Sequence, residues 1–283
     1  MYRRTLCLIG VTLWVASAQA QPPAGRGGGL SAKNPALPAN LFTSASTLAH
    51  TSLRHEWVEI PMDRAKLHTW IEYPAGEAKA PLVLLMHYDA GLDDLQRAIA
   101  DQLATDGFIA VAPDLLSRLG PKGGNHDSFP YPDEALRTLA GMRPEEALRR
   151  FRIAFDYGMK LPRANGKAAA LGCGFGGTSC FRFAAEAPNL SAAVVFYGMP
   201  PDPAEAAKIH APVLGLYGGD DPGIVATIEP TSALMKKLGK SYEFHIYPGA
   251  THFFMSYQVE GRNGEAVAEA WPTAITFMKQ AMQ

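Results

Sequence analysis

Runs of apolar residues alternate with amphipathic stretches along most of this 283-residue sequence. Residues 92–103 and 144–155 each place apolar side chains on one helical face, which predicts two helices. Continuous apolar runs, typical of parallel strands covered on both faces, occupy residues 81–87, 108–113, 168–172, 192–197 and 213–217, and a sixth candidate occupies 242–247. Strands that alternate with helices predict an α/β fold with a doubly wound, mostly parallel sheet and helices on both faces.

Two segments depart from this alternation. Residues 57–60 and 66–73 are short alternating stretches, which favour an antiparallel ribbon at an edge of the sheet. The Gly- and Pro-containing segment between Asp114 and Arg143 is too long for a plain connection in a compact domain. We expect this segment to form a lid or a substrate loop beside a functional site.

The first 20 residues have the three parts of a secretory signal. Arg3 and Arg4 precede an apolar stretch over residues 5–16, and the small residues Ala18 and Ala20 form a cleavage site. A membrane anchor is the alternative, but about 12 apolar residues are too few to span about 30 Å of hydrocarbon. We therefore expect cleavage after Ala20, a periplasmic or secreted protein, and no membrane insertion afterwards.

The rest of the chain divides into a leader and one domain. Residues 21–38 are rich in Pro, Gly and Ala and lack helical or alternating periodicity, so residues 21–54 are expected to form a flexible leader. Residues 55–283 have the length of a single α/β domain with a full-sized core.

Composition narrows the classes of partner. The formal net charge is −1 at pH 7 and no basic run is interleaved with aromatic residues, so nothing favours nucleic acid or an anionic membrane. A small-molecule substrate or ligand is the expected partner.

After signal cleavage Cys173 and Cys180 remain, and seven residues of helix rise about 10.5 Å, beyond the roughly 7 Å Cα separation of a disulfide. Two free thiols are expected.

Functional residues of an open parallel sheet are expected at the carboxyl ends of its strands. Four such places stand out: His-Tyr-Asp at 87–89, Gly-Cys-Gly-Phe-Gly-Gly at 172–177, Gly-Gly-Asp-Asp-Pro at 218–222 and Gly-Ala-Thr-His at 249–252. A nucleophile turn, an acid and a histidine, in this order, are the triad of an α/β-hydrolase. Gly172 and Gly176 have the spacing of a nucleophile elbow, but the residue at its apex is Gly174, which has no side chain to attack a substrate.

These motifs resemble those of the dienelactone hydrolase family over nearly all of residues 55–282. The matching pieces are Ala-Pro-Asp-Leu at 112–115, Gly-Cys-Gly-Phe-Gly-Gly at 172–177, Tyr-Gly-Gly-Asp-Asp-Pro at 217–222, Tyr-Pro-Gly-Ala-Thr-His-Phe-Phe at 247–254 and Ala-Trp at 270–271. Each piece alone is a weak signal, whereas their joint order and spacing are specific. The resemblance implies the α/β-hydrolase fold in a single domain, hydrolysis of small esters or lactones, and no cofactor.

The resemblance also implies catalytic roles for individual residues. His252 falls on the general base, and Asp221 falls on the carboxylate that orients it, with Asp220 as the less well aligned neighbour. The nucleophilic cysteine of the family falls on Gly174. The covalent step through that position is therefore lost, because glycine cannot form an acyl-enzyme.

Further positions concern the oxyanion and the substrate. The backbone N–H groups of Phe175 and Asp89 fall on the two oxyanion donors of the family. Tyr88 stands where relatives carry a glutamate that contacts the cysteine, and it is a candidate to line the pocket. Arg118 matches an arginine that binds the substrate carboxylate in the family, whereas the usual partner of that arginine falls on Ser256.

Three interpretations of the nucleophile remain open. Cys173 lies one place before the apex, so it is either a displaced nucleophile activated by His252 or a buried small side chain that ends a strand. Alternation along a strand points its sulfur away from the site, which favours the buried side chain. The third interpretation is a water molecule that His252 activates directly in the space beside Gly174.

A metal site is not predicted. His87 and Asp89, two residues apart, would share a face of an extended segment and are candidate ligands together with His126 or Asp127. The sequence contains no ligand spacing typical of zinc or iron.

Two functions are consistent with the sequence. The first is an exported hydrolase-family protein that acts on a small ester or lactone through the His252–Asp221 pair, with a non-standard or absent nucleophile. The alternative is a catalytically inactive protein on the hydrolase fold that binds a small ligand, in which Arg118 recognises a carboxylate.

Overall fold

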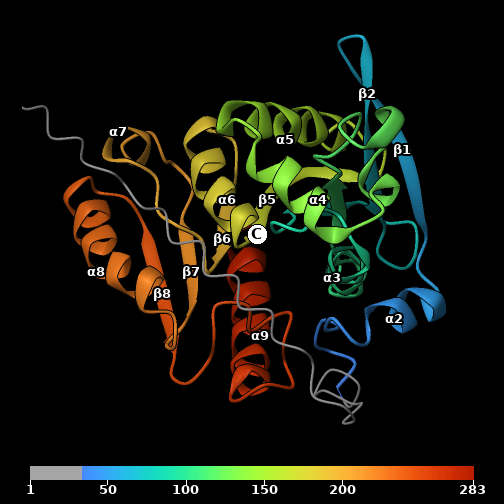
Figure 1. Cartoon of the computed structure of the whole chain (residues 1–283). Helices are drawn as coiled ribbons and strands as arrows, with labels where there is room; N and C mark the ends of the chain where they lie inside the picture. Colours follow the sequence, from blue (N-terminus) through green and yellow to red (C-terminus); the bar gives the residue numbers. More distant parts are fainter. Residues whose placement is uncertain (1–33) are drawn as a thin grey trace, which may run out of the picture.

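A computed structural model describes residues 34–283, which contain one mixed eight-stranded sheet (Figure 1). The strands are β1 (His55–Met62), β2 (Ala65–Glu72), β3 (Ala80–Met86), β4 (Ile109–Pro113), β5 (Ala164–Cys173), β6 (Ala192–Phe196), β7 (Val213–Gly218) and β8 (Tyr242–Tyr247). Their order in the sheet is β1-β2-β4-β3-β5-β6-β7-β8. β1 and β2 form an antiparallel ribbon and β2 is antiparallel to β4, whereas the strands from β4 to β8 are parallel. The edge ribbon and the predicted parallel strands are confirmed.

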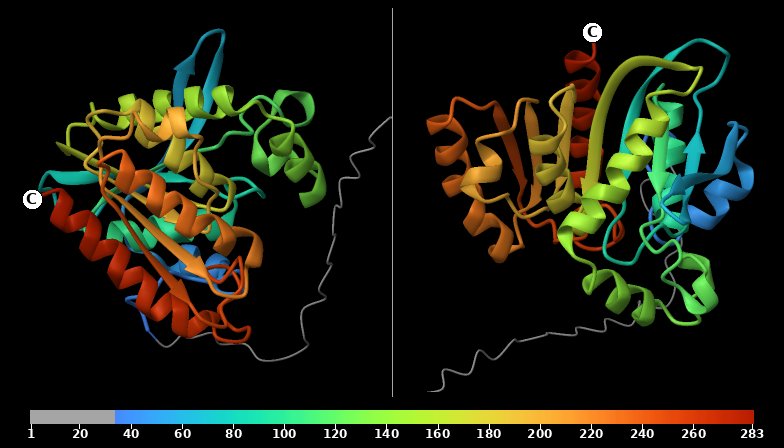
Figure 2. Two further views of the ribbon diagram at one scale, coloured as in Figure 1. Left: turned by 90° about the vertical axis from the view of Figure 1, so that its left-hand side faces the viewer. Right: turned by 90° about the horizontal axis from the view of Figure 1, so that it is seen from above.

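Helices cover both faces of this sheet, and Figure 2 shows α5 and α9 on opposite sides of it. The helices are α2 (Ser44–His50), α3 (Asp94–Thr105), α4 (Pro132–Ala140), α5 (Pro144–Gly158), α6 (Phe175–Glu186), α7 (Pro203–Ala206), α8 (Pro222–Lys237) and α9 (Asn263–Ala281). Alternate residues of β3 enter two separate cores: Leu82 and Leu84 pack with α4, α5 and α6, and Val83 and Leu85 pack with α3 and α9. The predicted fold class, a single α/β domain of the α/β-hydrolase type, is therefore confirmed.

Local signals explain where two of these helices begin. Asp93 is the N-cap of α3, and its side chain accepts the N–H of Gln96 at 3.0 Å, which satisfies one of the free donors of the first turn. Pro144 opens α5, where its fixed φ and missing N–H cost nothing. Two acidic residues follow it in the first turn, where they complement the helix dipole.

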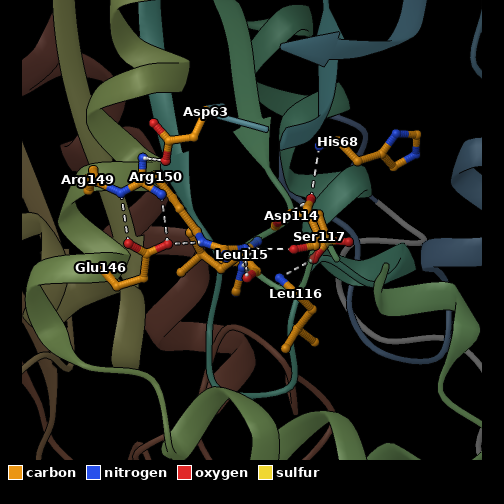
Figure 3. Close-up of polar contacts among 10 residues, drawn as sticks. Asp63, His68, Asp114, Leu115, Leu116, Ser117, Glu146, Arg149 and Arg150 are labelled. Carbon is orange, nitrogen blue, oxygen red and sulfur yellow. Dashed lines mark hydrogen bonds and ion pairs between the residues drawn. The ribbon is translucent and has the colours of Figure 1, made fainter. Parts of the chain in front are cut away.

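The segment between β4 and α5 is held at its base by a polar network (Figure 3). Arg150, 6% exposed, donates from Nη1 to the carbonyl oxygens of Leu115 and Ser117, both at 2.8 Å. The carboxylate of Asp114 accepts the N–H of His126 at 2.8 Å. Beyond this base the segment contains two short 3-10 turns, η1 (Pro121–Gly123) and η2 (His126–Ser128), followed by α4. The base of the segment is thus fixed to α5, and its role as a lid or substrate loop stays a prediction.

Residues 34–54 differ from the flexible leader that composition predicts. They include α2, which packs against α3, and Leu37, which is 5% exposed in the core beneath α3 and α9. Gln258, 4% exposed, donates from Nε2 to the carbonyl oxygen of Pro38 at 3.0 Å. Apolar burial and buried hydrogen bonds therefore fix this part of the chain to the domain.

The predicted signal over residues 1–20 and the first part of the leader lie outside the described residues. Within residues 34–283, none of the helices combines the length and the apolar character that crossing a membrane requires.

Candidate active site

The turn between β5 and α6 is an elbow whose apex carries no side chain. Gly174 has φ +54° and ψ −113°, and its N–H donates to the carbonyl oxygen of Phe196 at 3.0 Å. A Cβ on Gly172 would lie 2.1 Å from the carbonyl oxygen of Gly176, and one on Gly176 would lie 1.9 Å from that of Met86, so both positions require glycine. A Cβ on Gly174 would meet no atom closer than 3.7 Å. A Cβ would therefore fit at the apex of the elbow, the position that the family resemblance assigns to the nucleophile.

His252 and Asp221 meet at the carboxyl ends of β7 and β8. Asp221 is the N-cap of α8, where Oδ1 accepts the N–H of Ile224 at 3.3 Å, and its Oδ2 contacts Nδ1 of His252. The neighbouring Asp220 instead donates its N–H to the carbonyl oxygen of Ala250 at 2.9 Å. The aspartate that contacts the histidine is therefore Asp221. Because Nδ1 faces the carboxylate, Nε2 is the nitrogen left to meet a substrate or water.

Two aromatic rings connect Gly174 with His252. The position of a Cβ on Gly174 is 3.7 Å from Cε1 of Phe253 and 3.8 Å from Cε2 of Tyr197. The same two rings lie 4.4 Å and 5.0 Å, centroid to centroid, from the imidazole ring of His252. The apex of the elbow and the imidazole ring of His252 therefore lie against the same two aromatic rings.

Tyr197 and Phe253 are site residues that the sequence analysis missed. Tyr197 directly follows β6. It therefore lies at the carboxyl end of a parallel strand, where functional residues of such a sheet are expected. Its φ of +41° is uncommon for a bulky residue, and such backbone conformations cluster at functional sites. Phe253 gives no separate signal, because an aromatic residue beside a histidine is ordinary in sequence.

Cys173 and Cys180 are free thiols, as their spacing predicts. The Cys173 side chain is 1% exposed, in the core beneath α3 and α9. Burial raises the pKa of Cys173 to about 12, although a hydrogen bond with Tyr197 lowers it slightly. The thiol is therefore protonated at neutral pH, and in the described part of the chain no hydrogen bond joins it to His252. These are the properties of a core side chain, and they weigh against a displaced nucleophile.

Tyr88, in the place of a glutamate, ties two elements together. Its hydroxyl donates to Oδ2 of Asp93 at 2.5 Å, which links the loop after β3 to the start of α3. Burial and the neighbouring carboxylate raise the pKa of Tyr88, so its phenol stays neutral. Tyr88 therefore makes a structural hydrogen bond at the position that a glutamate is expected to occupy in relatives.

The two expected oxyanion donors differ in their surroundings. Phe175 is the first residue of α6, so its N–H has no acceptor within the helix and is available beside Gly174. At Asp89, burial raises the pKa of the carboxyl group, while hydrogen bonds from the N–H groups of Asp89 and Ala90, and the charge of His252, lower it. Unlike Phe175, Asp89 places a half-buried carboxyl group of its own residue beside its N–H.

The expected carboxylate clamp is not assembled at this site. Arg118 lines a surface hollow of about 250 Å³, to which the elbow and the His252 loop contribute no residue. Its other lining residues are Glu59, Lys66, His68, Ser117, Gly123, Gly124 and Asn125. Ser256 is 4% exposed, and its carbonyl oxygen accepts the N–H of Leu41 at 3.1 Å, so the N-terminal segment covers it.

His87 has a structural role at the end of β3. Its neutral ring donates from Nδ1 to the carbonyl oxygen of Tyr88 at 2.8 Å and accepts the N–H of Leu115 at Nε2, at 3.3 Å. Burial lowers the pKa of His87 to about 4, which keeps the ring neutral. Between residues 34 and 283, no group of three or more His, Cys, Asp or Glu side chains is arranged to hold a metal ion.

Known proteins share both the sequence pattern and the fold. A relative from Saccharolobus solfataricus named "Putative carboxymethylenebutenolidase" is 30% identical over 234 residues, which cover 70% of this chain and 88% of the relative. The crystal structure titled "Putative Dienelactone Hydrolase" from Klebsiella pneumoniae has a TM-score of 0.71 at 22% identity and covers 81% of this chain and all (100%) of its own. A dienelactone hydrolase from Anabaena variabilis has a TM-score of 0.65 at 23% identity, with coverages of 82% and 100%. The two structures are similar in fold.

The family comparison covers the whole of the candidate site. The sequence model described as "Dienelactone hydrolase family" matches residues 67–282, a range that runs from β2 to the end of α9 and includes Gly174, Asp221 and His252. The chain therefore belongs to the dienelactone hydrolase family.

Proposed function

We propose that this protein hydrolyses a small ester or lactone with a water molecule, rather than a side chain, as the nucleophile. The observation that carries the proposal is the His252–Asp221 contact, because the imidazole ring lies against the same two aromatic rings as the apex at Gly174. The relative named as a carboxymethylenebutenolidase supports the ester and lactone class.

In this mechanism His252 acts first as a general base and then as a general acid. Nε2 takes a proton from the water as the water oxygen attacks the carbonyl carbon of the substrate. Negative charge forms on the carbonyl oxygen, where the N–H of Phe175 stabilises it. When the C–O bond to the leaving group breaks, Nε2 returns the proton to the leaving oxygen, and an acid and an alcohol are released.

Asp221 supports both proton transfers through His252. Its contact with Nδ1 keeps the proton of the neutral imidazole on that nitrogen, so Nε2 is free to act as the base. The carboxylate also stabilises the positive charge that the ring carries between the two transfers. Asp221 is only 13% exposed, which keeps this interaction largely out of water.

A binding protein without turnover is the second candidate function. The carboxyl group of Asp89 belongs to the residue whose N–H falls on the second oxyanion position, and a negative charge there would weaken stabilisation of a tetrahedral intermediate. In such a protein the room at Gly174 and the rings of Tyr197 and Phe253 would hold a ligand.

Assays of the purified protein on phenyl acetate and small lactones separate these candidates. We expect slow, saturable hydrolysis by the wild type, a loss of about a hundredfold or more in His252→Ala, and full retention in Cys173→Ala. Mass spectrometry during turnover should detect no acyl-enzyme. Loss of activity in Cys173→Ala would support the thiol as nucleophile, and an inert wild type that still binds a lactone would favour the binding protein.

We also propose that the protein acts after export. Arg3 and Arg4, the apolar residues 5–16 and the Ala18–Ala20 cleavage site support this. Expression in a Gram-negative host, cell fractionation and N-terminal sequencing are the test. We expect the periplasmic protein to begin at Gln21, and a full-length protein confined to the cytoplasm would refute export.

A further inference from the structure

The hollow beside the β1–β2 ribbon contains two basic side chains. Its volume is about 250 Å³, and it is separate from the candidate active site, because neither the elbow nor the His252 loop lines it. Lys66 on β2 and Arg118, in the segment after β4, both line it, and none of the ion pairs within residues 34–283 involves either of them. The acidic side chain among the lining residues is that of Glu59. Two cations and one carboxylate therefore surround the hollow, which favours an anionic occupant.

The guanidinium group of Arg118 lies over the backbone of Gly123. A Cβ on Gly123 would be 3.5 Å from both Cζ and Nη2 of Arg118 and 3.7 Å from Nη1. These nearly equal distances place the glycine over the face of the planar group, so the N–H groups at its edges are directed past the glycine rather than at it. A ligand with two acceptor oxygens can therefore meet this edge.

The backbone of Arg118 is strained and is held by the residue before it. Its φ of +68° is uncommon outside glycine, and such conformations cluster at ligand clamps and active sites. The preceding Ser117 accepts the N–H of His68 at Oγ, at 2.9 Å, and its carbonyl oxygen accepts Nη1 of Arg150 at 2.8 Å (Figure 3). Arg118 is thus positioned against β2 and α5 before any ligand arrives, which lowers the cost of binding one.

His68 gives the hollow an aromatic wall and engages the carboxylate of Glu59. The imidazole ring stacks on Trp57, with 4.0 Å between the ring centroids and 10° between the ring planes. Its Nδ1 lies 2.5 Å from Oε1 of Glu59, in a hydrogen bond that holds the carboxylate at the histidine. Because Glu59 pairs with His68 and with neither of the two cations, both keep their charge for a ligand.

We infer that this hollow is a second ligand site, in which Arg118 and Lys66 bind the phosphoryl group of a small phosphate. A guanidinium binds two phosphate oxygens at once, and an ammonium group adds a point charge. Two cations also favour the phosphate dianion over a carboxylate, which carries one charge. At about 250 Å³ the hollow is below the roughly 300–1,000 Å³ of pockets for drug-sized ligands, so the occupant is a phosphate ion or a small phosphate monoester.

Titration of isotope-labelled protein with inorganic phosphate, followed by NMR, tests this site. Work at about pH 8 keeps phosphate largely in its dianionic form, and sodium chloride holds the ionic strength constant. We expect saturable shifts of the amide signals of His68, Gly123, Gly124 and Asn125, and none at Gly174. Acetate should bind at least about threefold more weakly, because it carries one charge.

Charge variants then assign the binding to the hollow. Lys66→Gln and Arg118→Gln should each weaken phosphate binding by at least about fivefold. Lys208→Gln and Arg137→Gln are the matched controls, because they remove the same charges at exposed positions outside the hollow and should bind phosphate as the wild type does. Glu59→Gln should bind phosphate about threefold more tightly, because it removes the negative charge and retains an oxygen for His68.

The outcomes separate this site from the proposed hydrolysis, because the titration needs no turnover. Thermal unfolding shows which variants are folded, and any one of the three hollow variants suffices for the comparison. Saturable shifts that are absent or centred on the elbow, or a folded Lys66→Gln or Arg118→Gln variant that binds like the wild type, would overturn the site. Glycerol 3-phosphate distinguishes the two sources of the phosphoryl group: tighter binding than inorganic phosphate supports a monoester, and weaker binding supports the free ion.

Discussion

One carboxylate oxygen of Asp221 contacts His252, and the other caps the start of helix α8. The helix cap requires only an acceptor, whereas the histidine requires an acceptor that is also charged. A substitution that keeps the acceptor and removes the charge therefore separates the two roles.

Asp221→Asn is expected to change the free energy of unfolding by less than about 1 kcal/mol, because asparagine caps helices as well as aspartate. The same change should lower kcat/KM by about a hundredfold or more, because an amide neither stabilises the imidazolium nor enforces the required tautomer. Steady-state kinetics on phenyl acetate and chemical unfolding measure the two effects. Asp220→Asn is the control, and an equal loss of activity there would contradict the assignment.

Gly174→Cys is expected to add a covalent step to the reaction. The nearest atoms leave room for its Cβ, and a side chain at φ +54° and ψ −113° should cost about 1–3 kcal/mol of stability. Because Phe253 and Tyr197 connect this position with His252, the new thiol should be acylated by phenyl acetate, which peptide mass spectrometry detects at position 174.

Gly174→Ala is the control for this experiment, since it carries the same backbone strain without a thiol. We expect it to lose the wild-type activity, because its methyl group occupies the place assigned to water. A Gly174→Cys protein that folds but is never acylated would show that the apex is out of line with the general base.

The two thiols of residues 34–283 should resist alkylation in the native protein. Burial raises the pKa of Cys173 to about 12 and also raises that of Cys180, so the reactive thiolate is scarce at pH 8. Iodoacetamide followed by peptide mapping should label both residues only after unfolding. Rapid native labelling of Cys173 would contradict this and would revive it as a nucleophile.

Glu72 should make stability fall as the pH rises. It is fully buried on β2, and burial together with Asp101 raises its pKa from 4.5 to about 8, despite a hydrogen bond of 2.9 Å from Trp70 that lowers it. A carboxyl group with a raised pKa in the folded state stabilises the protein below its unfolded pKa, and this contribution is lost as the pH rises through the folded value. The free energy of unfolding should therefore decline between about pH 5 and pH 9.

Glu72→Gln isolates this effect, because the amide is neutral over the whole range. Its unfolding free energy should change less with pH than that of the wild type, and the two curves should separate most at high pH. A wild type that gains stability relative to Glu72→Gln as the pH rises would contradict this prediction.

Gln258 should anchor the N-terminal segment. Gln258→Ala removes the hydrogen bond to Pro38 and leaves a buried carbonyl without its donor, which should cost about 1–3 kcal/mol. Hydrogen exchange measured by mass spectrometry should become faster over residues 37–43. Gln280→Ala, at an exposed position of α9, is the control, and equal exchange in both variants would show that the anchor is dispensable.

The fold was predictable from the sequence because its signals are local. The central parallel strands are buried on both faces and so form continuous apolar runs, whereas the edge strand β8 is half exposed. The elbow needs glycines at fixed spacing because a Cβ would meet backbone atoms. The proximity of Asp221 and His252 was likewise predictable, because both follow parallel strands that end at the same edge of the sheet.

The rest of the site depends on contacts between distant segments. Tyr197 borders the elbow only because β6 lies beside β5, and nothing within the strand marks its strained backbone. Arg118 matches a family motif, but it adopts φ +68° and lines the hollow at the β1–β2 ribbon. Leu37 lies next to a Pro- and Gly-rich stretch whose composition hides its place in the core.

The N-terminal segment has a consequence for limited proteolysis of the protein. Leu41 and Pro38 bond to Ser256 and Gln258, a few residues beyond His252. A protease that digests the chain from its N-terminus would therefore leave activity intact only while its cuts stop short of this contact. The N-terminal limit of the functional domain is thus expected at about Pro38, well before β1.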